Sequence, residues 1–166
     1  MATKGNARLM KLNTGTREFS GACVVIVKTE WNAGITNELE NGCLKILEKH
    51  GVKMVKTLTV PGSVEIPFGI KQYWEAVKYK DDRPSAFIAL GCVIRGDTPH
   101  FEYVCQSVTT GIGQLNLQLP VPVIYGILTV NDLKQAEERI GGKHGHKGEE
   151  AALTALKMIA LVKSFK

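Results

Sequence analysis

Four strand-sized apolar runs alternate with stretches of helical spacing, and this alternation constrains the fold more than any other feature of the chain. Each run is followed by a short polar segment and then by apolar residues that recur every three or four positions. Strands that alternate with helices in this way form a parallel sheet, because each helix carries the chain back to the edge where it began. The four predicted strands are residues 22–27, 54–60, 86–90 and 121–129.

The spacing also predicts where the helices lie. The first has an apolar face that includes Ile35 and Leu39, and it ends at His50, next to a glycine that suits the C′ position. We expect the helix dipole to favour this histidine as a cation. The others start near residues 66 and 101, followed by a short helix over 131–140, a glycine-rich break over 141–148 and a last helix over 149–163. We therefore predict an α/β protein with a flavodoxin-like architecture, in which helices cover both faces of a four-stranded parallel sheet.

Length and composition fit one folded domain with a polar arm in front of it. The 166 residues suffice for a core, and no repeat or change of composition divides them. Residues 1–20 are polar and basic, so we expect an arm there rather than a secretory signal, and a single domain over residues 21–166. No apolar run is long enough to cross a bilayer. We expect a cytoplasmic protein that does not bind membranes.

The net charge and the spacing of the cysteines limit which ligands the chain is expected to bind. The net charge is +5, but Lys and Arg are dispersed and do not alternate with aromatic residues, so we expect no nucleic-acid binding. A basic chain suits small anionic substrates equally well. The four cysteines have no close-paired spacing, which predicts reduced core residues and neither a disulfide framework nor a metal site. They are Cys23, Cys43, Cys92 and Cys105.

The loop over residues 91–103 carries the side chains most suited to chemistry. It joins a buried strand to a helix, the corner where parallel α/β proteins bind ligands. Gly96 and Thr98, with the first N–H groups of the helix, can hold an anion, and an imidazole such as that of His100 can transfer a proton near neutral pH. The loop also allows a plainer interpretation, in which Asp97 or Thr98 caps the helix and Arg95 and His100 are surface residues.

Two further loops are expected at the same edge of the sheet. Trp31 could stack on a planar ring and Asn32 could hydrogen-bond to it, while Glu65 could accept hydrogen bonds from hydroxyl groups. Each has a structural alternative. Trp31 could pack on its own sheet, and Glu65 could simply be a favourable charge at a helix N-terminus.

These loops resemble the 6,7-dimethyl-8-ribityllumazine synthase family from about Phe19 onward. The most specific stretches are VPGSVEIP at 60–67, LGCVIRGDTPHF at 90–101 and PVIYGILT at 122–129, followed by AEER at 136–139 and KGEEAA at 147–152. The resemblance implies condensation of 5-amino-6-(D-ribitylamino)uracil with 3,4-dihydroxy-2-butanone 4-phosphate. Phosphate and water would be released, and no metal or organic cofactor would be used.

The resemblance also assigns roles. His100 would transfer protons. The pyrimidine and its ribityl chain would be bound by Trp31, Asn32, Ser63, Val64, Glu65, Val93, Ile94, Tyr125, Lys147 and Glu150. The phosphate would be bound by Gly96, Asp97, Thr98 and Arg139. Trp31 and Tyr125 stand where the family usually has Phe, and Val64 replaces a frequent aromatic, so ring packing is where this chain departs from the family. We expect His144 and His146 to be solvated loop residues.

Assembly is part of what the resemblance implies. The family builds its site between neighbouring subunits of a pentamer, with Arg139 and Tyr125 contributed by the adjacent chain, and twelve pentamers can close into a sixty-chain shell. The polar arm would pair with an adjacent subunit, and association with riboflavin synthase is a further expectation. Two rival functions stay open: a flavin-binding electron carrier, which would need a phosphate loop in place of residues 28–32, and a purely structural shell protein.

Overall fold

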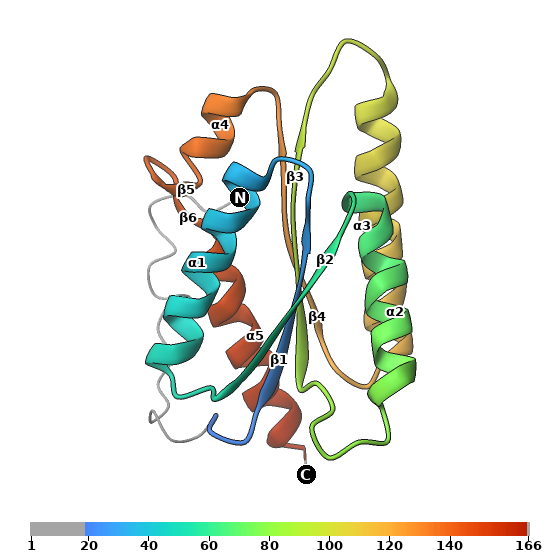
Figure 1. Cartoon of the computed structure of the whole chain (residues 1–166), viewed down its shortest axis with the longest axis vertical. Helices are drawn as coiled ribbons and strands as arrows, with labels where there is room; N and C mark the ends of the chain where they lie inside the picture. Colours follow the sequence, from blue (N-terminus) through green and yellow to red (C-terminus); the bar gives the residue numbers. More distant parts are fainter. Residues whose placement is uncertain (1–18, 166) are drawn as a thin grey trace.

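Four parallel strands form the central sheet, in the order β2-β1-β3-β4 (Figure 1). The computed structural model describes residues 19–165, so most of the predicted arm lies outside the described residues. All three strand pairs are parallel. The predicted flavodoxin-like α/β architecture is confirmed. The strands are β1 (Cys23–Thr29), β2 (Met54–Val60), β3 (Ala86–Ile94) and β4 (Val123–Val130).

Helices cover both faces of this sheet. Helices α1 (Ala33–Lys49) and α5 (Lys147–Lys163) pack on one face, and α2 (Ile66–Val77) and α3 (His100–Gln118) on the other (Figure 1). A short turn of 3-10 helix, η2 (Ser63–Glu65), precedes α2. After β4 come the short helix α4 (Leu133–Glu137) and a small antiparallel hairpin of β5 (Ile140–Gly142) and β6 (Gly145–His146).

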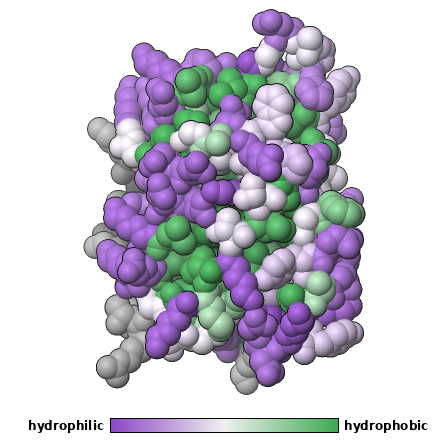
Figure 2. Space-filling model, in the orientation of Figure 1, coloured by the Kyte–Doolittle hydropathy of each residue, from purple (hydrophilic) through white to green (hydrophobic). Residues whose placement is uncertain are grey.

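The strand sequences are nearly continuous apolar runs because both faces of the sheet are buried. In β1, Val24 and Ile26 pack toward α1 and α5, whereas Val25 and Val27 pack toward α2 and α3. Strand β2 lies at the edge of the sheet and is more exposed. The face that it crosses shows apolar side chains scattered among polar ones (Figures 1 and 2).

The cysteines are free, as predicted. Cys23, Cys43 and Cys92 are buried and Cys105 is half-buried. Burial raises the pKa of the Cys43 thiol to about 12, and the thiol donates a hydrogen bond of 3.1 Å to the carbonyl of Gly148. Burial also raises the pKa of Cys92 to about 11. Thiols held in the neutral form are poor nucleophiles, so these two have a packing role.

Several boundaries differ from the sequence prediction. Strand β3 continues to Ile94, because Val93 and Ile94 pair with Thr129 and Val130 of β4, so the loop predicted from residue 91 begins at Arg95. The helix predicted over 131–140 spans only Leu133–Glu137. Most of the predicted break is the β5–β6 hairpin, which uses positive φ angles at Gly141, where the pairing of β5 is irregular, and at Gly145, the first residue of β6.

Two of the histidines also differ from prediction. His146 is not a solvated residue: its ring lies so close to Gly42 that a Cβ there would overlap it, and its Nδ1 is buried. His144 is exposed, as predicted, with Nε2 3.5 Å from a carboxylate oxygen of Glu138. His50 does follow α1, with φ +78° at Gly51. Burial, and to a smaller extent the neighbouring Lys49 cation, lower the pKa of His50, whereas the expected stabilisation of its cation would have raised it.

No helix within residues 19–165 is long and apolar enough to span a membrane.

The contact between α1 and α5 gives a direct test of this packing. A Cβ at Gly148 would overlap the backbone carbonyl of Leu39, and backbone atoms cannot rotate away. We expect Gly148→Ala to lower the free energy of unfolding by about 1–3 kcal/mol, the usual cost of overpacking a core. Gly34→Ala is the control, because nothing lies within 4 Å of its Cβ position. Denaturant unfolding of the two variants measures the difference, and equal midpoints would contradict the packing described.

Candidate active site

Three loops meet at the carboxyl edge of the sheet, as the topology predicted. The loop after β1 carries Trp31 and Asn32, and η2 after β2 carries Ser63, Val64 and Glu65. The third begins where β3 ends and leads into α3. The end of β3 carries Val93 and Ile94, and the loop and the start of α3 carry Gly96, Asp97, Thr98 and His100. We call these three loops, with the end of β3, the rim.

The first loop is held in a conformation that exposes the indole. Asn32 has φ 57° and ψ 42°, and it is the only residue other than glycine with a positive φ within residues 19–165. Its side-chain amide donates a hydrogen bond of 2.8 Å to the carbonyl of Cys92 on β3. The hydroxyl of Thr29 donates one of 3.0 Å to the carbonyl of Trp31. The Trp31 side chain is 73% exposed, so it does not pack on its own sheet.

The second loop lies directly beside the first. A Cβ at Gly62 would meet Glu65 Oε2 at 3.0 Å and Trp31 Cδ1 at 3.9 Å, so these two side chains flank the glycine. Ser63 is buried, and a Cβ at Gly91 would lie 2.8 Å from its hydroxyl, which explains a glycine inside β3. Val64 and Glu65 are exposed. Glu65 also stands immediately before α2, so the helix-terminus interpretation of its charge remains compatible with the structure.

The third loop is open to solvent. Residues 95–100 are exposed, and nothing lies within 4 Å of a Cβ at Gly96. The N-cap of α3 is Pro99, and no side chain caps this helix. The alternative in which Asp97 or Thr98 caps α3 is therefore wrong. The first N–H groups of α3 remain available to an anion, next to His100 as the first helical residue.

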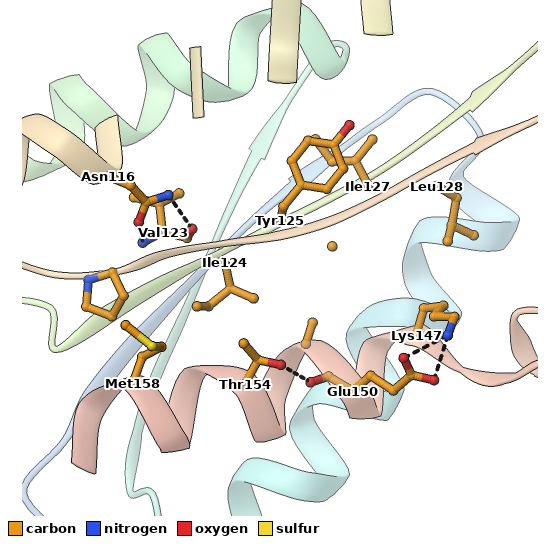
Figure 3. Close-up of a pocket in the computed structure, with 13 residues that line it drawn as sticks. Asn116, Val123, Ile124, Tyr125, Ile127, Leu128, Lys147, Glu150, Thr154 and Met158 are labelled. Carbon is orange, nitrogen blue, oxygen red and sulfur yellow. Dashed lines mark hydrogen bonds and ion pairs between the residues drawn. The ribbon is translucent and has the colours of Figure 1, made fainter. Parts of the chain in front are cut away.

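The remaining predicted site residues lie elsewhere, around the exposed edge of β4. Tyr125, Lys147 and Glu150 line a groove of about 490 Å³ between α3 and α5 (Figure 3). Tyr125 points to the α3 side of β4, whereas Lys147 and Glu150 lie on the α5 side (Figure 3). Lys147 Nζ is 2.7 Å from both carboxylate oxygens of Glu150. Arg139 is adjacent, because its carbonyl accepts a hydrogen bond of 2.8 Å from the Lys147 backbone.

Tyr125 and Arg139 are both anchored within their own chain. The phenol of Tyr125 is hydrogen-bonded to the hydroxyl of Thr109 at 3.1 Å. Burial raises the pKa of Tyr125, which keeps the phenol neutral at physiological pH. The guanidinium of Arg139 donates to the carbonyl of Gln135 at 2.6 Å. One face of the groove therefore presents a fixed ring, and the other presents charged groups.

The predicted site residues thus fall into two groups on this chain. Tyr125 lies five residues before Val130, which pairs with Ile94 at the rim, so the ring is set back by about 16 Å along the strand. Within the described residues, no hydrogen bond or ion pair joins the rim side chains named above to Tyr125, Arg139, Lys147 or Glu150, which we call the edge group. Neither group alone surrounds a ligand.

The groove also contains residues that sequence analysis did not single out. Asn116 of α3 donates a hydrogen bond of 2.8 Å to the carbonyl of Val123 and accepts one of 2.9 Å from its N–H. This amide takes the place of a further strand at the edge of the sheet. Thr154 and Met158 line the α5 side. Only the position of Asn116 near the apolar stripe of its helix could have drawn attention to it.

No group of three or more potential metal ligands is found among the His, Cys, Asp and Glu side chains of residues 19–165.

Comparison with known proteins identifies the family. The profile of the 6,7-dimethyl-8-ribityllumazine synthase family matches residues 21–163. The chain is 52% identical to the protein of that name from Bacteroides fragilis over 139 residues, which cover 82% of this chain and 94% of that protein. It is 51% identical to the one from Phocaeicola vulgatus, over 81% of this chain and 78% of that protein.

A third relative agrees with these two. The 6,7-dimethyl-8-ribityllumazine synthase of Parabacteroides distasonis is 50% identical over 136 residues, which cover 81% of this chain and 82% of that protein. The family match spans the rim, the edge group and the whole sheet between them. The chain belongs to the 6,7-dimethyl-8-ribityllumazine synthase family.

Proposed function

We propose that this chain forms 6,7-dimethyl-8-ribityllumazine in riboflavin biosynthesis by condensing 5-amino-6-(D-ribitylamino)uracil with 3,4-dihydroxy-2-butanone 4-phosphate. Membership of the family supports the activity. The structural observation that supports this site is the separation of its groups. The rim and the edge group lie at separate places on the chain, and each offers only part of the groups that bind the two substrates. Phosphate and water leave, and the chain needs no cofactor.

The rim suits the pyrimidine. The exposed indole of Trp31 offers a flat face for stacking, and Glu65, which also lies beside Gly62, offers acceptors for the ribityl hydroxyl groups. Ser63, Val64, Val93 and Ile94 complete this side of the site. Asn32 contributes mainly through its backbone, since its side-chain amide already donates to Cys92.

The third loop suits the phosphate. Gly96 lets the backbone approach an anion, Thr98 and Asp97 lie beside it, and the uncapped N–H groups of α3 point at the same region. Arg139 adds a guanidinium that can bind phosphate through two parallel hydrogen bonds. Stabilising the charge that builds up on the departing phosphate lowers the barrier to its loss.

His100 is placed to move protons during the reaction. The amine of the pyrimidine attacks the ketone to give an imine with loss of one water, phosphate is eliminated, and the ribityl-bearing nitrogen closes the ring with loss of a second water. Each step transfers a proton, and an imidazole at the start of α3, beside the phosphate loop, can accept and return it. The substrate supplies its own amine. Holding two substrates in attack geometry therefore accounts for much of the acceleration.

A neighbouring copy of the chain completes the site. The edge group would face the rim of the next subunit, and such a head-to-tail contact closes into a ring, which we propose to be a pentamer. A second groove, of about 570 Å³ between α2 and α3, supports this arrangement because it exposes Val64, Phe68 and Tyr103 next to the rim. A neighbour seated there would cover them. Lys147 and Glu150 of that neighbour would then lie near the bound pyrimidine.

Larger assembly follows from the same proposal. Pentamers would close into a sixty-chain shell, with residues 1–20 as an arm that pairs with an adjacent subunit ahead of a single domain over residues 21–166. Association with riboflavin synthase, which would consume the product, and a cytoplasmic location complete the proposed setting.

The activity itself is the first test. Purified protein with both substrates should produce the fluorescent lumazine and free phosphate in equal amounts, with and without a strong chelator, because no step of the proposed mechanism uses a metal. Fluorescence and phosphate release measure the two products. Folded protein that makes no lumazine from fresh substrates would contradict the function and leave the shell-protein alternative.

Removing one residue from the rim and one from the edge group should change different kinetic constants. We expect His100→Ala to lower kcat by about 10²–10⁴-fold, the usual contribution of acid–base catalysis, with little change in KM for the phosphate substrate. We expect Arg139→Ala to raise KM for the butanone phosphate, because it loses a charge-assisted contact. Steady-state kinetics with each substrate varied in turn measures both. Unchanged kinetics in Arg139→Ala would remove this residue from the site.

A further inference from the structure

The loop that we assign to the phosphate has little packing to hold it. Residues 95–100 are exposed, the Cβ position of Gly96 touches nothing, and no side chain caps the helix that follows. Such a segment loses conformational entropy when it binds an anion, which weakens binding unless the loop is already held in place.

Arg95, the first residue of the loop, makes the contacts that span its base. Its backbone N–H donates to the carbonyl of Val130 at 2.9 Å and continues the pairing of β3 with β4. Its side chain forms an ion pair with Glu102 in the first turn of α3. The guanidinium carbon also lies 4.2 Å from the ring centre of Phe101. One side chain thus ties the strand end to the helix start.

A third contact ties the same side chain to the segment just before α4. Nε of Arg95 donates a hydrogen bond of 3.1 Å to the side-chain carbonyl of Asn131. Asn131 is itself fixed, because its N–H donates to the side chain of Gln135 at 3.0 Å. Gln135 in turn donates its N–H to Asp132, the N-cap of α4, at 2.8 Å. The segment that leads to Arg139 is therefore connected to the base of the phosphate loop.

We propose that Arg95 is a positioning residue that braces the loop of residues 96–100 through Glu102, and does not itself bind the phosphate. Its Nε, one terminal nitrogen and one face of the guanidinium are engaged by Asn131, Glu102 and Phe101. The Glu102 carboxylate also balances the charge of the guanidinium, which weakens its attraction for a further anion. Arg95 also lowers the pKa of Glu102, as expected for a carboxylate held by a guanidinium. The inference rests on the proposed function of this loop.

Loss of the contact between Arg95 and Glu102 should change the affinity for the butanone phosphate and not the turnover. Without the brace, the loop would occupy its binding conformation for only part of the time, and apparent affinity falls by that fraction. If that fraction were about one tenth, KM for the butanone phosphate would rise about tenfold. At saturating phosphate substrate the bound loop is ordered again, so kcat should stay within about twofold. KM for the pyrimidine should not change.

Four variants distinguish a positioning role of Arg95 from direct binding of the phosphate by Arg95. Arg95→Ala, Glu102→Ala and the double variant should raise KM for the butanone phosphate to the same extent, because residues that act as one unit are not additive. Glu102→Gln keeps an acceptor without the charge and should have an intermediate effect. Asp82→Ala is the matched control: it removes an exposed carboxylate paired with Lys56 at 2.5 Å, before β3 begins, and should leave both KM values unchanged.

The opposite pattern would overturn the inference. If Arg95 bound phosphate itself, Glu102→Ala would free the guanidinium, and KM for the butanone phosphate would stay the same or fall while Arg95→Ala raised it. Wild-type kinetics in both single variants would remove Arg95 from any role in the loop. Failure of the proposed function looks different, since the unsubstituted protein would then form no lumazine.

Discussion

Parallel pairing of four strands is the constraint on which the rest of the structure depends. In register, Thr29 lies beside Val60 and Ile94 beside Val130, so the strands deliver their loops to one edge. Backbone hydrogen bonds extend this pairing past the strands, from Glu30 to Val60 and from Arg95 to Val130, both at 2.9 Å. The loops that carry Trp31, Glu65 and His100 inherit their positions from this ladder. The rim is a consequence of the sheet.

Much of the fold could be predicted from the sequence, because buried parallel strands leave a strong signal. Strand β2 has the predicted bounds, and β1 and β4 were found within two residues at either end. The predicted strand boundaries were wrong where a glycine suggested a turn or break but instead lies within a strand. Gly91 leaves room for Ser63 inside a continuing strand, and the glycines of the β5–β6 hairpin hide two very short strands. Such contacts are tertiary and leave no periodic pattern.

The candidate site was predictable to a different extent in its two halves. Topology alone placed Trp31, Glu65 and His100 on one edge. Nothing in their spacing indicated Tyr125, Lys147 or Arg139, which only the resemblance to a family singled out. The ion pair of Arg95 with Glu102 was also invisible, since residues seven apart across a loop have no fixed geometry. His146 seemed solvated because its contact with Gly42 joins distant parts of the chain.

The central claim is that two subunits share each site, and mixing two variants that are impaired in different groups tests it most directly. His100→Ala damages only the rim, and Arg139→Ala only the edge group. In rings reassembled at random from equal amounts, about one contact in four would join an intact rim to an intact edge group. The account predicts that, at a butanone phosphate concentration well below the raised KM of Arg139→Ala, the mixture recovers roughly a quarter of the unsubstituted activity although each variant alone is impaired. A mixture no more active than the average of its two components would contradict it.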